Sequence, residues 1–289
     1  MKRADVIGTG RLGKALTAWL AGGGWQVDRI VSRDAARARR LAKRLGARRG
    51  QGLAEYRQPA ELVFVAVPDD ALAGLARRLA QRADEWSGKV VLHASGALDA
   101  SVLSPLRELG ASTGSMHPLM TFARRGRAPL PKEVVFAIEG DRKAEQAAFE
   151  LANAWGGKPL QLRPEQKPAY HLAATFASPM IVVMFALARE QLRRSGLNRE
   201  AQGRAAAGLQ RLLKQTAANL GNGSATAAQS AWTGAIARGD HETIRRHRAI
   251  AGPSRHVYDA LVANAERLLG TAGAKPQSRS KDRDLGNDG

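Results

Sequence analysis

The sequence predicts an α/β protein in which an N-terminal domain with a parallel sheet is followed by an all-α C-terminal domain. Short apolar runs alternate with helical patterns up to residue 163, and the pattern is helical from residue 164 onward. A length of 289 residues also favours two domains over one core. We therefore expect a first domain at 1–163, a helical domain at 164–270 and a polar, disordered tail at 271–289.

The first element is a short apolar strand at residues 4–7, which a glycine-rich turn follows directly. The turn contains Gly8, Gly10 and Gly13 in the spacing G-x-G-x-x-G, and an amphipathic helix begins near Arg11. The first glycine permits the tight turn, the second lets a pyrophosphate approach the backbone, and the third lets helix and strand pack closely. The free N–H groups of the helix would face the phosphates. This turn predicts a Rossmann-like domain that binds a dinucleotide.

The second strand, at residues 27–31, ends where such domains distinguish NAD(H) from NADP(H). An NAD-selective domain usually carries Asp or Glu there, which accepts from the ribose 2′-OH. Here Ser32 and Arg33 follow the strand, and an arginine can pair with a 2′-phosphate instead. Asp34 is the opposing observation, because its carboxylate could accept from the hydroxyl; the arginines at 37–49 could also be a solvated helix face. We expect NADP(H) as the cofactor.

Two later strands, at 62–67 and 90–92, open into loops at the same predicted edge of the sheet. Val67 and Pro68 close the first strand, and His93-Ala94-Ser95-Gly96 follows the second. Ligands of open parallel sheets bind beyond the carboxyl ends of the strands, so both loops should lie beside the cofactor. The predicted cofactor-binding residues are Gly8, Thr9, Gly10, Arg11, Leu12, Gly13, Ser32, Arg33, Val67, Pro68 and Ser95.

A His-Pro pair stands in the stretch GSMHPLMTFARRGR, after another short strand. A loop that only connects elements would more often consist of Gly, Asn, Asp and Ser. His117 should reach the same sheet edge as the two preceding loops. We favour a chemical role for His117 over a purely structural one.

One apolar helix in the second half carries a single row of polar side chains. Residues 169–188 contain no Asp, Glu, Lys or Arg, a length that would suit a membrane span. Lys167, His171, Thr175 and Ser178 recur at i, i+4, i+8 and i+11, which places them on one face. Such polar interruptions favour a helix buried within a domain or a dimer, facing something polar. The alternative for His171 is a core histidine bonded to a backbone carbonyl.

The amino-acid composition limits the ligands and the cellular location that we expect. The net charge is +19, but the 34 Arg and 11 Lys are spread over the whole chain and no nucleic-acid-binding motif accompanies them, so nucleic acid is not the expected ligand. The absence of cysteine removes disulfides, thiolate zinc sites and a cysteine nucleophile, and it fits a reducing cytoplasm. The chain enters a strand at once, without a signal-peptide pattern. We expect a cytoplasmic protein with no metal and no membrane span.

The motifs together resemble the Rossmann-like oxidoreductases with a helical C-terminal domain of uncharacterised function, relatives of pyrroline carboxylate reductase and the phosphogluconate dehydrogenase superfamily. The matching stretches are VIGTGRLG, SRD, AVPDDAL, HASGAL, HPLMTF, YHLAATFAS and WTGAIARGD. Two positions depart from the family pattern: Pro179 replaces the Asn after FAS, and Ala235 replaces the Pro before IARGD. Some members are similar to alternative ketopantoate reductases, and the His-Pro pair resembles that of prephenate dehydrogenases.

The resemblance implies an NADP-dependent reductase of a small carboxylated carbonyl or imine compound, with a ketopantoate-like 2-oxo acid as the first guess. Hydride delivery leaves negative charge on the substrate heteroatom, so a proton donor is needed. The predicted catalytic residues are His117, Lys167 and His171, on opposite walls of a cleft between domains; Ser95, Thr121 and Ser178 should bind substrate, and Arg124 or Arg125 could pair with its carboxylate. The helical domain should form a homodimer. The alternative is a non-enzymatic NADP(H)-binding sensor or interaction module.

Overall fold

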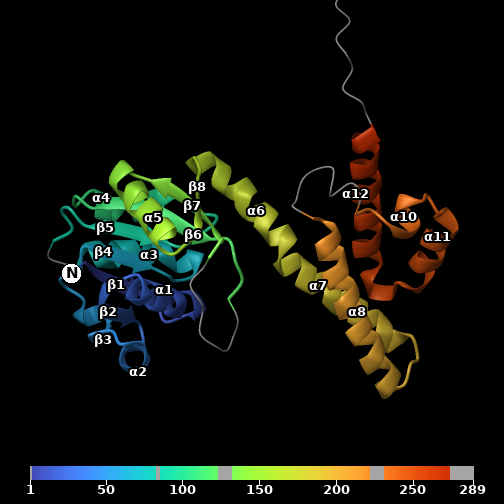
Figure 1. The fold of residues 1–289 in the computed structure, drawn as a ribbon, viewed down its shortest axis with the longest axis horizontal. Coiled ribbons are helices and arrows are strands. Elements are labelled where there is room, and N and C mark those ends of the chain that lie inside the picture. Colours follow the sequence, from blue (N-terminus) through green and yellow to red (C-terminus); the bar gives the residue numbers. More distant parts are fainter. Residues whose placement is uncertain (1, 83–84, 123–131, 222–230, 274–289) are drawn as a thin grey trace, which may run out of the picture. The chain divides into compact units, whose positions relative to one another are not determined.

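The computed structural model of the protein describes residues 2–82, 85–122, 132–221 and 231–273 (Figure 1). The chain forms two compact units, Met1–Pro179 and Met180–Gly289. The first unit contains an eight-stranded sheet, and the second is helical wherever its regular structure is described. This confirms the predicted fold class.

The sheet of the first unit has the strand order β3-β2-β1-β4-β5-β6-β7-β8. Every neighbouring pair is parallel except β6 and β7, which run antiparallel. The sequence did not indicate β3, because its residues RGQG contain no apolar run. The strands are β1 (Arg3–Ile7), β2 (Gln26–Ser32), β3 (Arg49–Gly52), β4 (Leu62–Val65), β5 (Val90–His93), β6 (Ser112–Pro118), β7 (Val135–Gly140) and β8 (Lys158–Gln161).

The strand order creates a switch point between β1 and β4. The chain runs outward from β1 through β2 to β3 and then returns to place β4 on the other side of β1. The loops after β1 and β4 therefore diverge, and an open α/β sheet leaves its ligand crevice at such a point. The glycine-rich turn follows β1 directly.

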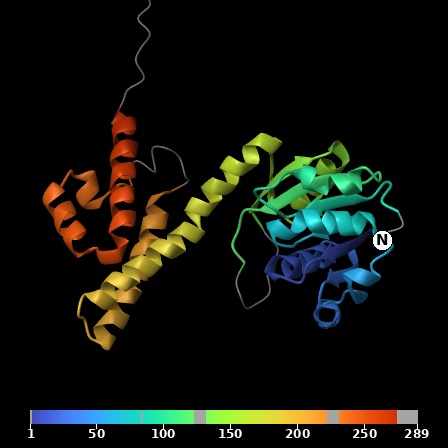
Figure 2. The same cartoon turned by 180° about the vertical axis from the view of Figure 1, so that it is seen from behind.

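Helices cover both faces of the sheet, which Figures 1 and 2 show from opposite sides. On one face, α1 (Arg11–Gly22), α2 (Ala35–Leu45) and α5 (Arg142–Ala154) contribute to one buried apolar cluster. On the other face, α3 (Asp69–Ala80) and α4 (Ser104–Arg107) contribute to a second. The sheet is thus buried on both sides, as parallel sheets require. Three-residue and four-residue 3₁₀ helices connect some of these elements: η1 (Leu53–Glu55), η2 (Ala100–Leu103) and η3 (Pro164–Gln166).

The predicted apolar helix is divided into two. Helix α6 spans Lys167–Ala177 and α7 spans Pro179–Arg194, with Ser178 between them in a non-helical conformation. The first unit includes α6 and so extends beyond the predicted boundary at residue 163, because Lys167 and Tyr170 bind residues of the sheet edge. Pro179 begins the next helix, the position where proline is best tolerated.

The sequence predicted that the apolar helix would be buried either within a domain or within a dimer. The apolar side chains of α6 and α7 are not buried within a domain. Phe176 is 63% exposed and Val182 is 68% exposed. The stretch Pro164–Arg194 also has the length and hydropathy of a helix that could cross a membrane, which by itself is weak evidence. Burial in a dimer, the other form of that prediction, stays a proposal.

The second unit continues from α7 with α8 (Arg199–Asn219), α10 (Gly234–Ala237), α11 (His241–Ile250), η4 (Gly252–Ser254) and α12 (Arg255–Gly273). Helices α7 and α8 run alongside each other in Figures 1 and 2. Asp240 caps α11: its Oδ1 accepts from the backbone N–H of Thr243 at 3.0 Å. The last helix reaches Gly273, three residues into the predicted tail, and 274–289 lie outside the described residues.

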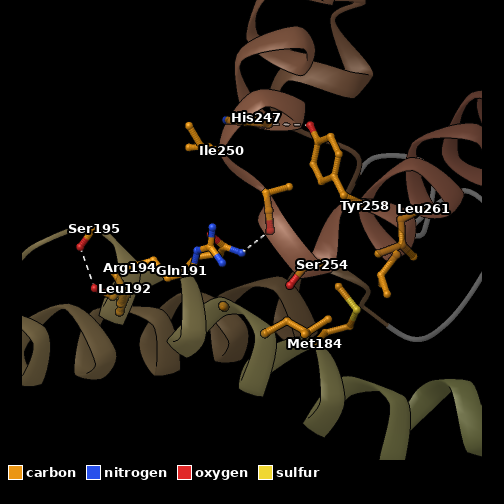
Figure 3. A pocket seen from close by; sticks show the side chains of 14 residues that line it. Met184, Gln191, Leu192, Arg194, Ser195, His247, Ile250, Ser254, Tyr258 and Leu261 are labelled. Atoms are coloured by element: carbon orange, nitrogen blue, oxygen red, sulfur yellow. Dashed lines mark hydrogen bonds between the residues drawn. The ribbon is translucent and has the colours of Figure 1, made fainter.

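An apolar cavity of about 800 Å³ lies inside the second unit, between α7, α11 and α12 (Figure 3). Its lining combines apolar side chains such as Met184 and Leu261 with a His247–Tyr258 pair, whose Nδ1 and hydroxyl oxygen are 2.9 Å apart. Gln191 donates from Nε2 to the carbonyl of Ala251 at 3.0 Å. None of the residues predicted to act in the site belongs to this lining.

Candidate active site

The glycine-rich turn has the geometry that its sequence predicts. Gly8 has a φ of +126°, and a Cβ there would lie 2.1 Å from the carbonyl oxygen of Ala66. A Cβ on Gly13 would lie 2.1 Å from the carbonyl oxygen of Gly8, so the third glycine permits close packing of the helix. At Gly10, by contrast, a Cβ would meet nothing within 4 Å. The open side of the turn is therefore left to a ligand.

A cavity of about 320 Å³ adjoins this turn at the switch point of the sheet. Of the predicted cofactor-binding residues, Gly8, Thr9, Gly10, Ser32, Arg33, Val67 and Pro68 line it. Helix α1 begins beside it with Gly10 as N-cap, without a side-chain cap or an acidic residue in its first turn. The N–H groups at Arg11, Leu12 and Gly13 thus remain for an anion, and the residues present fit a dinucleotide.

Positive charge dominates the lining of this cavity. Arg33, Arg37 and Arg78 belong to it, and Arg37 also donates from Nη2 to the carbonyl of Thr9 at 3.0 Å. Asp34 is the only acid among the described residues of the lining, and its Oδ1 caps α2 by accepting from the N–H of Arg37 at 2.9 Å. The cap gives Asp34 a structural role, and the three arginines favour a phosphate group at this end of the cavity.

The loop after β5 is held by its own side chains. Ser95 donates from Oγ to Asp69 Oδ2 at 2.8 Å and accepts from the N–H groups of Ala97 and Leu98 at 3.2 and 3.0 Å. The Ser95 N–H donates to Nδ1 of His93 at 3.2 Å. The hydroxyl hydrogen of Ser95 is therefore engaged, and the side chain shapes the loop instead of facing the cavity, whose lining does not include it.

His93 is a buried, neutral histidine below this loop. Because Nδ1 accepts from Ser95, the hydrogen is on Nε2, which lies 3.0 Å from the carbonyl oxygen of Asp99 and donates to it. Burial lowers the pKa of His93 to about 4, with the Lys167 charge acting in the same direction. His93 thus fixes both ends of the turn that carries Ser95 and Gly96.

Lys167 lies buried beneath the loop after β5, and its role as a proton donor stays a prediction. The residue is 1% exposed, and its Nζ donates to Ser115 Oγ at 2.7 Å and to the carbonyl of Ser95 at 3.2 Å. Burial lowers the pKa of Lys167, while Glu139, Asp99 and Asp69 oppose that shift. Lys167 therefore supports the loop from beneath.

His117 pairs with Tyr170, a residue that the sequence prediction did not include in the site. His117 is near the end of β6, and its Nδ1 lies 3.0 Å from the hydroxyl oxygen of Tyr170 on α6. Burial lowers the pKa of His117 to about 4 and raises the pKa of Tyr170 to about 12, so both are uncharged at neutral pH. The pair then has two hydrogens, of which one forms the mutual bond.

The second hydrogen of this pair takes no part in the bond between His117 and Tyr170. If the Tyr170 hydroxyl donates to Nδ1, His117 carries its own hydrogen on Nε2; if Nδ1 donates, the tyrosine hydroxyl hydrogen is free. In either state the pair offers one donor to a neighbouring group. An uncharged pair with one free donor suits the polarisation of a carbonyl or imine.

His171 lies beside His117, and Gly96 of the loop after β5 leaves room for both imidazole rings. The His171 and His117 rings are 6.0 Å apart, edge to face. A Cβ on Gly96 would lie 2.7 Å from Cδ2 of His171 and 3.0 Å from Cε1 and Nε2 of His117. His117 and His171 therefore lie side by side within the first unit, where the sequence analysis expected opposite walls.

The predicted substrate-binding residues Thr121 and Ser178 do not lie together with the two histidines. Thr121 is exposed, and Ser178 follows α6 seven residues after His171, about 10 Å along the helix. Arg124 and Arg125 lie outside the described residues. Tyr170 could have been included in the predicted site from its spacing, because it follows Lys167 by three positions and therefore lies on the same helix face.

Two family models match successive parts of the chain, and the second match begins within the first unit. Residues 2–118 match the model of a Rossmann-like domain, and residues 134–265 match DUF2520, a domain of unknown function. These matches confirm the resemblance to a Rossmann-like domain with a C-terminal DUF2520 region. No curated protein matches the sequence.

Solved structures share the whole fold. A "putative NADP oxidoreductase" from Bacteroides fragilis is 24% identical, with a TM-score of 0.76 over 92% of this chain and 98% of its own. A protein from Thermotoga maritima is 26% identical, with a TM-score of 0.69 over 93% and 99%. A reductive aminase from Aspergillus terreus, solved with NADPH and ethyl levulinate, is 19% identical with a TM-score of 0.61 over 94% of both chains. The chain thus has the fold of these proteins over nearly all its length.

Proposed function

We propose that the protein is an NADP(H)-dependent oxidoreductase that transfers hydride between NADPH and a small carboxylated carbonyl or imine compound. The observation that carries the proposal is the combination of two features in the first unit. One is a glycine turn, open at Gly10, beside a cavity with three arginines. The other is the uncharged His117–Tyr170 pair at the carboxyl end of β6.

The preference for NADP(H) rests on charge. A 2′-phosphate carries about two negative charges, and Arg33, Arg37 and Arg78 line the cavity beside the end of β2. Asp34 is the residue that could favour NAD(H), and it caps α2. The solved structures with the same fold include proteins named for NADP or bound to NADPH and NADP⁺, which supports this preference.

The chain's own residues would supply the proton and the orientation. The bound cofactor supplies the hydride. His117 and Tyr170 hold one donor hydrogen for the heteroatom that gains negative charge. Gly96 keeps the loop backbone close to the two histidine rings, and Lys167 fixes that loop through the Ser95 carbonyl.

Two classes of substrate are compatible with the proposal. The resemblance to alternative ketopantoate reductases favours a 2-oxo acid, with a ketopantoate-like compound first. The similar structures also include imine reductases from Myxococcus stipitatus, which favours a C=N substrate. Both substrates need the same donor, and the carboxylate-binding group could be one of the arginines near residue 124, which lie outside the described residues.

Two further proposals concern assembly and location. The apolar side chains exposed on α6 and α7, among them Leu172, Phe176 and Val182, would be buried in a homodimer. The absence of cysteine fits a cytoplasmic protein. A non-enzymatic NADP(H)-binding module remains the alternative function, because it would need the same cofactor cavity.

Consumption of NADPH at 340 nm tests the proposal. The protein is screened against ketopantoate and other 2-oxo acids, alone and with an amine that forms an imine. Turnover that disappears in His117→Ala, while NADPH still binds, supports the enzyme. Tight NADPH binding with no turnover of either class favours the binding module, and absent NADPH binding contradicts both.

A further inference from the structure

A buried line of polar groups crosses the first unit beneath the His117–Tyr170 pair. Glu139 Oε2, on β7, accepts from Ser115 Oγ on β6 at 3.3 Å. Ser115 Oγ accepts from Lys167 Nζ, on α6, at 2.7 Å. Lys167 donates in turn to the carbonyl of Ser95 at 3.2 Å. Ser115 is 0% exposed, Lys167 1% and Glu139 6%, so the whole line is shielded from solvent.

The same line fixes the site loop at both of its ends. Lys167 holds the carbonyl of Ser95, and Glu139 Oε2 accepts from the N–H of Ala100 at 2.9 Å. Gly96, where a Cβ would meet the two histidine rings, lies between these attachment points. Lys167 is also the first residue of α6, three and four residues before Tyr170 and His171. Movement at Glu139 would therefore be passed to both sides of the site.

Only one of the acids around Lys167 is suited to hold its charge. Glu139, Asp99 and Asp69 are the acidic groups that act on it, and His93 and His117 are the titratable bases nearby. Asp69 binds Ser95 and is exposed, and Asp99 Oδ1 accepts from the N–H of Ser101. Glu139 is buried and reaches Lys167 through a single hydroxyl. A buried ammonium requires such a partner.

We propose that Glu139 is a positioning residue of the site: it holds Lys167 through Ser115, and Lys167 holds the Ser95–Gly96 loop and the start of α6 against His117. The claim deepens the proposed function and rests on it for its chemical meaning. The arrangement itself belongs to the folded protein, so it can be measured in the resting state.

The test is a comparison of histidine signals in full-length variants. Glu139→Gln keeps the size of the side chain and removes its charge, Lys167→Met removes the ammonium, and the double variant combines them. Glu150→Gln, an exposed acid on α5, is the matched control. Imidazole nitrogen and carbon resonances of His93, His117 and His171 are recorded by NMR, with melting curves for each variant.

We expect Glu139→Gln to shift the His117 and His171 resonances and Glu150→Gln to leave them in place. In the Lys167→Met background the same Glu139 change should add a clearly smaller shift, because the part that passes through Lys167 is already lost and only the bond to the Ala100 N–H can still respond. Ser115→Ala, which breaks the line in the middle, gives the same comparison if Lys167→Met does not fold. Equal shifts in both backgrounds, or no shift in Glu139→Gln, would overturn the proposal.

NADPH binding and turnover separate this claim from the proposed function. The line shares no hydrogen bond with the glycine turn, so NADPH affinity should stay within about twofold in Glu139→Gln, while kcat falls on the order of tenfold. If the unmodified protein binds no NADPH, the proposed function fails, and the histidine comparison still decides the role of Glu139.

Discussion

The hydroxyl oxygen of Tyr170 lies 3.0 Å from Nδ1 of His117, which ties helix α6 to the end of strand β6. Their rings meet edge to face, with centroids 5.7 Å apart. Because burial keeps both groups uncharged, the bond is a neutral one and leaves one hydrogen to donate. The pair is thus the part of the first unit best suited to assist hydride transfer.

Replacing Tyr170 with Phe tests this pair. The variant keeps the ring and loses the hydroxyl, so His117 loses its hydrogen-bond partner and the pair loses one of its two hydrogens. We expect kcat to fall about 10²-fold with an identified substrate, and the Kd for NADPH to be unchanged. Tyr258→Phe removes the equivalent hydrogen bond to His247 in the helical unit and serves as the control. Full activity in Tyr170→Phe would exclude the pair from the reaction.

A methyl group at position 96 should displace the two histidines. In Gly96→Ala the new Cβ would lie 2.7 Å from His171 Cδ2, which is closer than real contacts allow. We expect kcat to fall on the order of tenfold to a hundredfold, with NADPH affinity retained. Gly74→Ala is the control, because its Cβ meets nothing within 4 Å in α3 and should stabilise the helix by about 0.5–1 kcal/mol. Steady-state kinetics and melting curves measure both effects.

The first two glycines of the turn should respond differently to alanine. Gly8→Ala combines a φ of +126° with a Cβ 2.1 Å from a backbone oxygen, and should cost at least about 2 kcal/mol in the free energy of unfolding. Gly10→Ala has open space and should alter stability by no more than about 0.5 kcal/mol. Its methyl occupies the ligand side of the turn, so NADPH affinity should fall at least about tenfold. Unchanged affinity in Gly10→Ala would mean that no pyrophosphate approaches there.

Buried histidines should make the first unit less stable in acid. The pKa of His93 falls from 6.5 to about 4 on folding, so the unfolded chain takes up a proton below pH 6.5 that the native state refuses until about pH 4. The free energy of unfolding therefore decreases as the pH falls through this window, by about 3 kcal/mol at most for His93. His117 contributes in the same direction.

Urea unfolding at pH 7 and pH 4.5 measures this dependence. The raised pKa values of Asp5 and Glu139 act in the opposite direction, so the informative quantity is the difference between variants. His93→Gln should flatten the pH dependence, whereas His241→Gln, an exposed histidine, should leave it as it was. If the free energy of unfolding of His93→Gln depends on pH as steeply as that of the unmodified protein, His93 is not neutral in the native protein.

Local patterns in the sequence were sufficient for the sheet domain and its cofactor turn. The spacing of Gly8, Gly10 and Gly13 after an apolar strand predicts a tight glycine turn, and the structure has backbone that leaves no room for a side chain at Gly8 and Gly13. His117 was expected directly after a short strand, and it lies near the end of β6. Strand β3 was missed because its RGQG residues give no apolar signal.

The arrangement of the site could not be read from local patterns. The bonded pairs are far apart in the sequence: Ser115 and Glu139 by 24 positions, and Ser115 and Lys167 by 52. Lysine, serine and glutamate are elsewhere ordinary surface residues. Their burial follows from the way α6 binds β6 through Lys167 and Tyr170, which no short window of sequence contains. For the same reason Lys167 was expected at an open wall and is found beneath the loop.

The most direct test of the account is a titration with NADPH and NADH, followed by tryptophan quenching at low and moderate salt. Arg33→Ala is compared with Arg44→Ala, an exposed arginine in the last turn of α2 that is not part of the cavity lining. We predict tighter binding of NADPH, a preference that Arg33→Ala removes and Arg44→Ala retains. Equal affinity for both cofactors, or no binding of either, would contradict the assignment of the cavity to NADP(H).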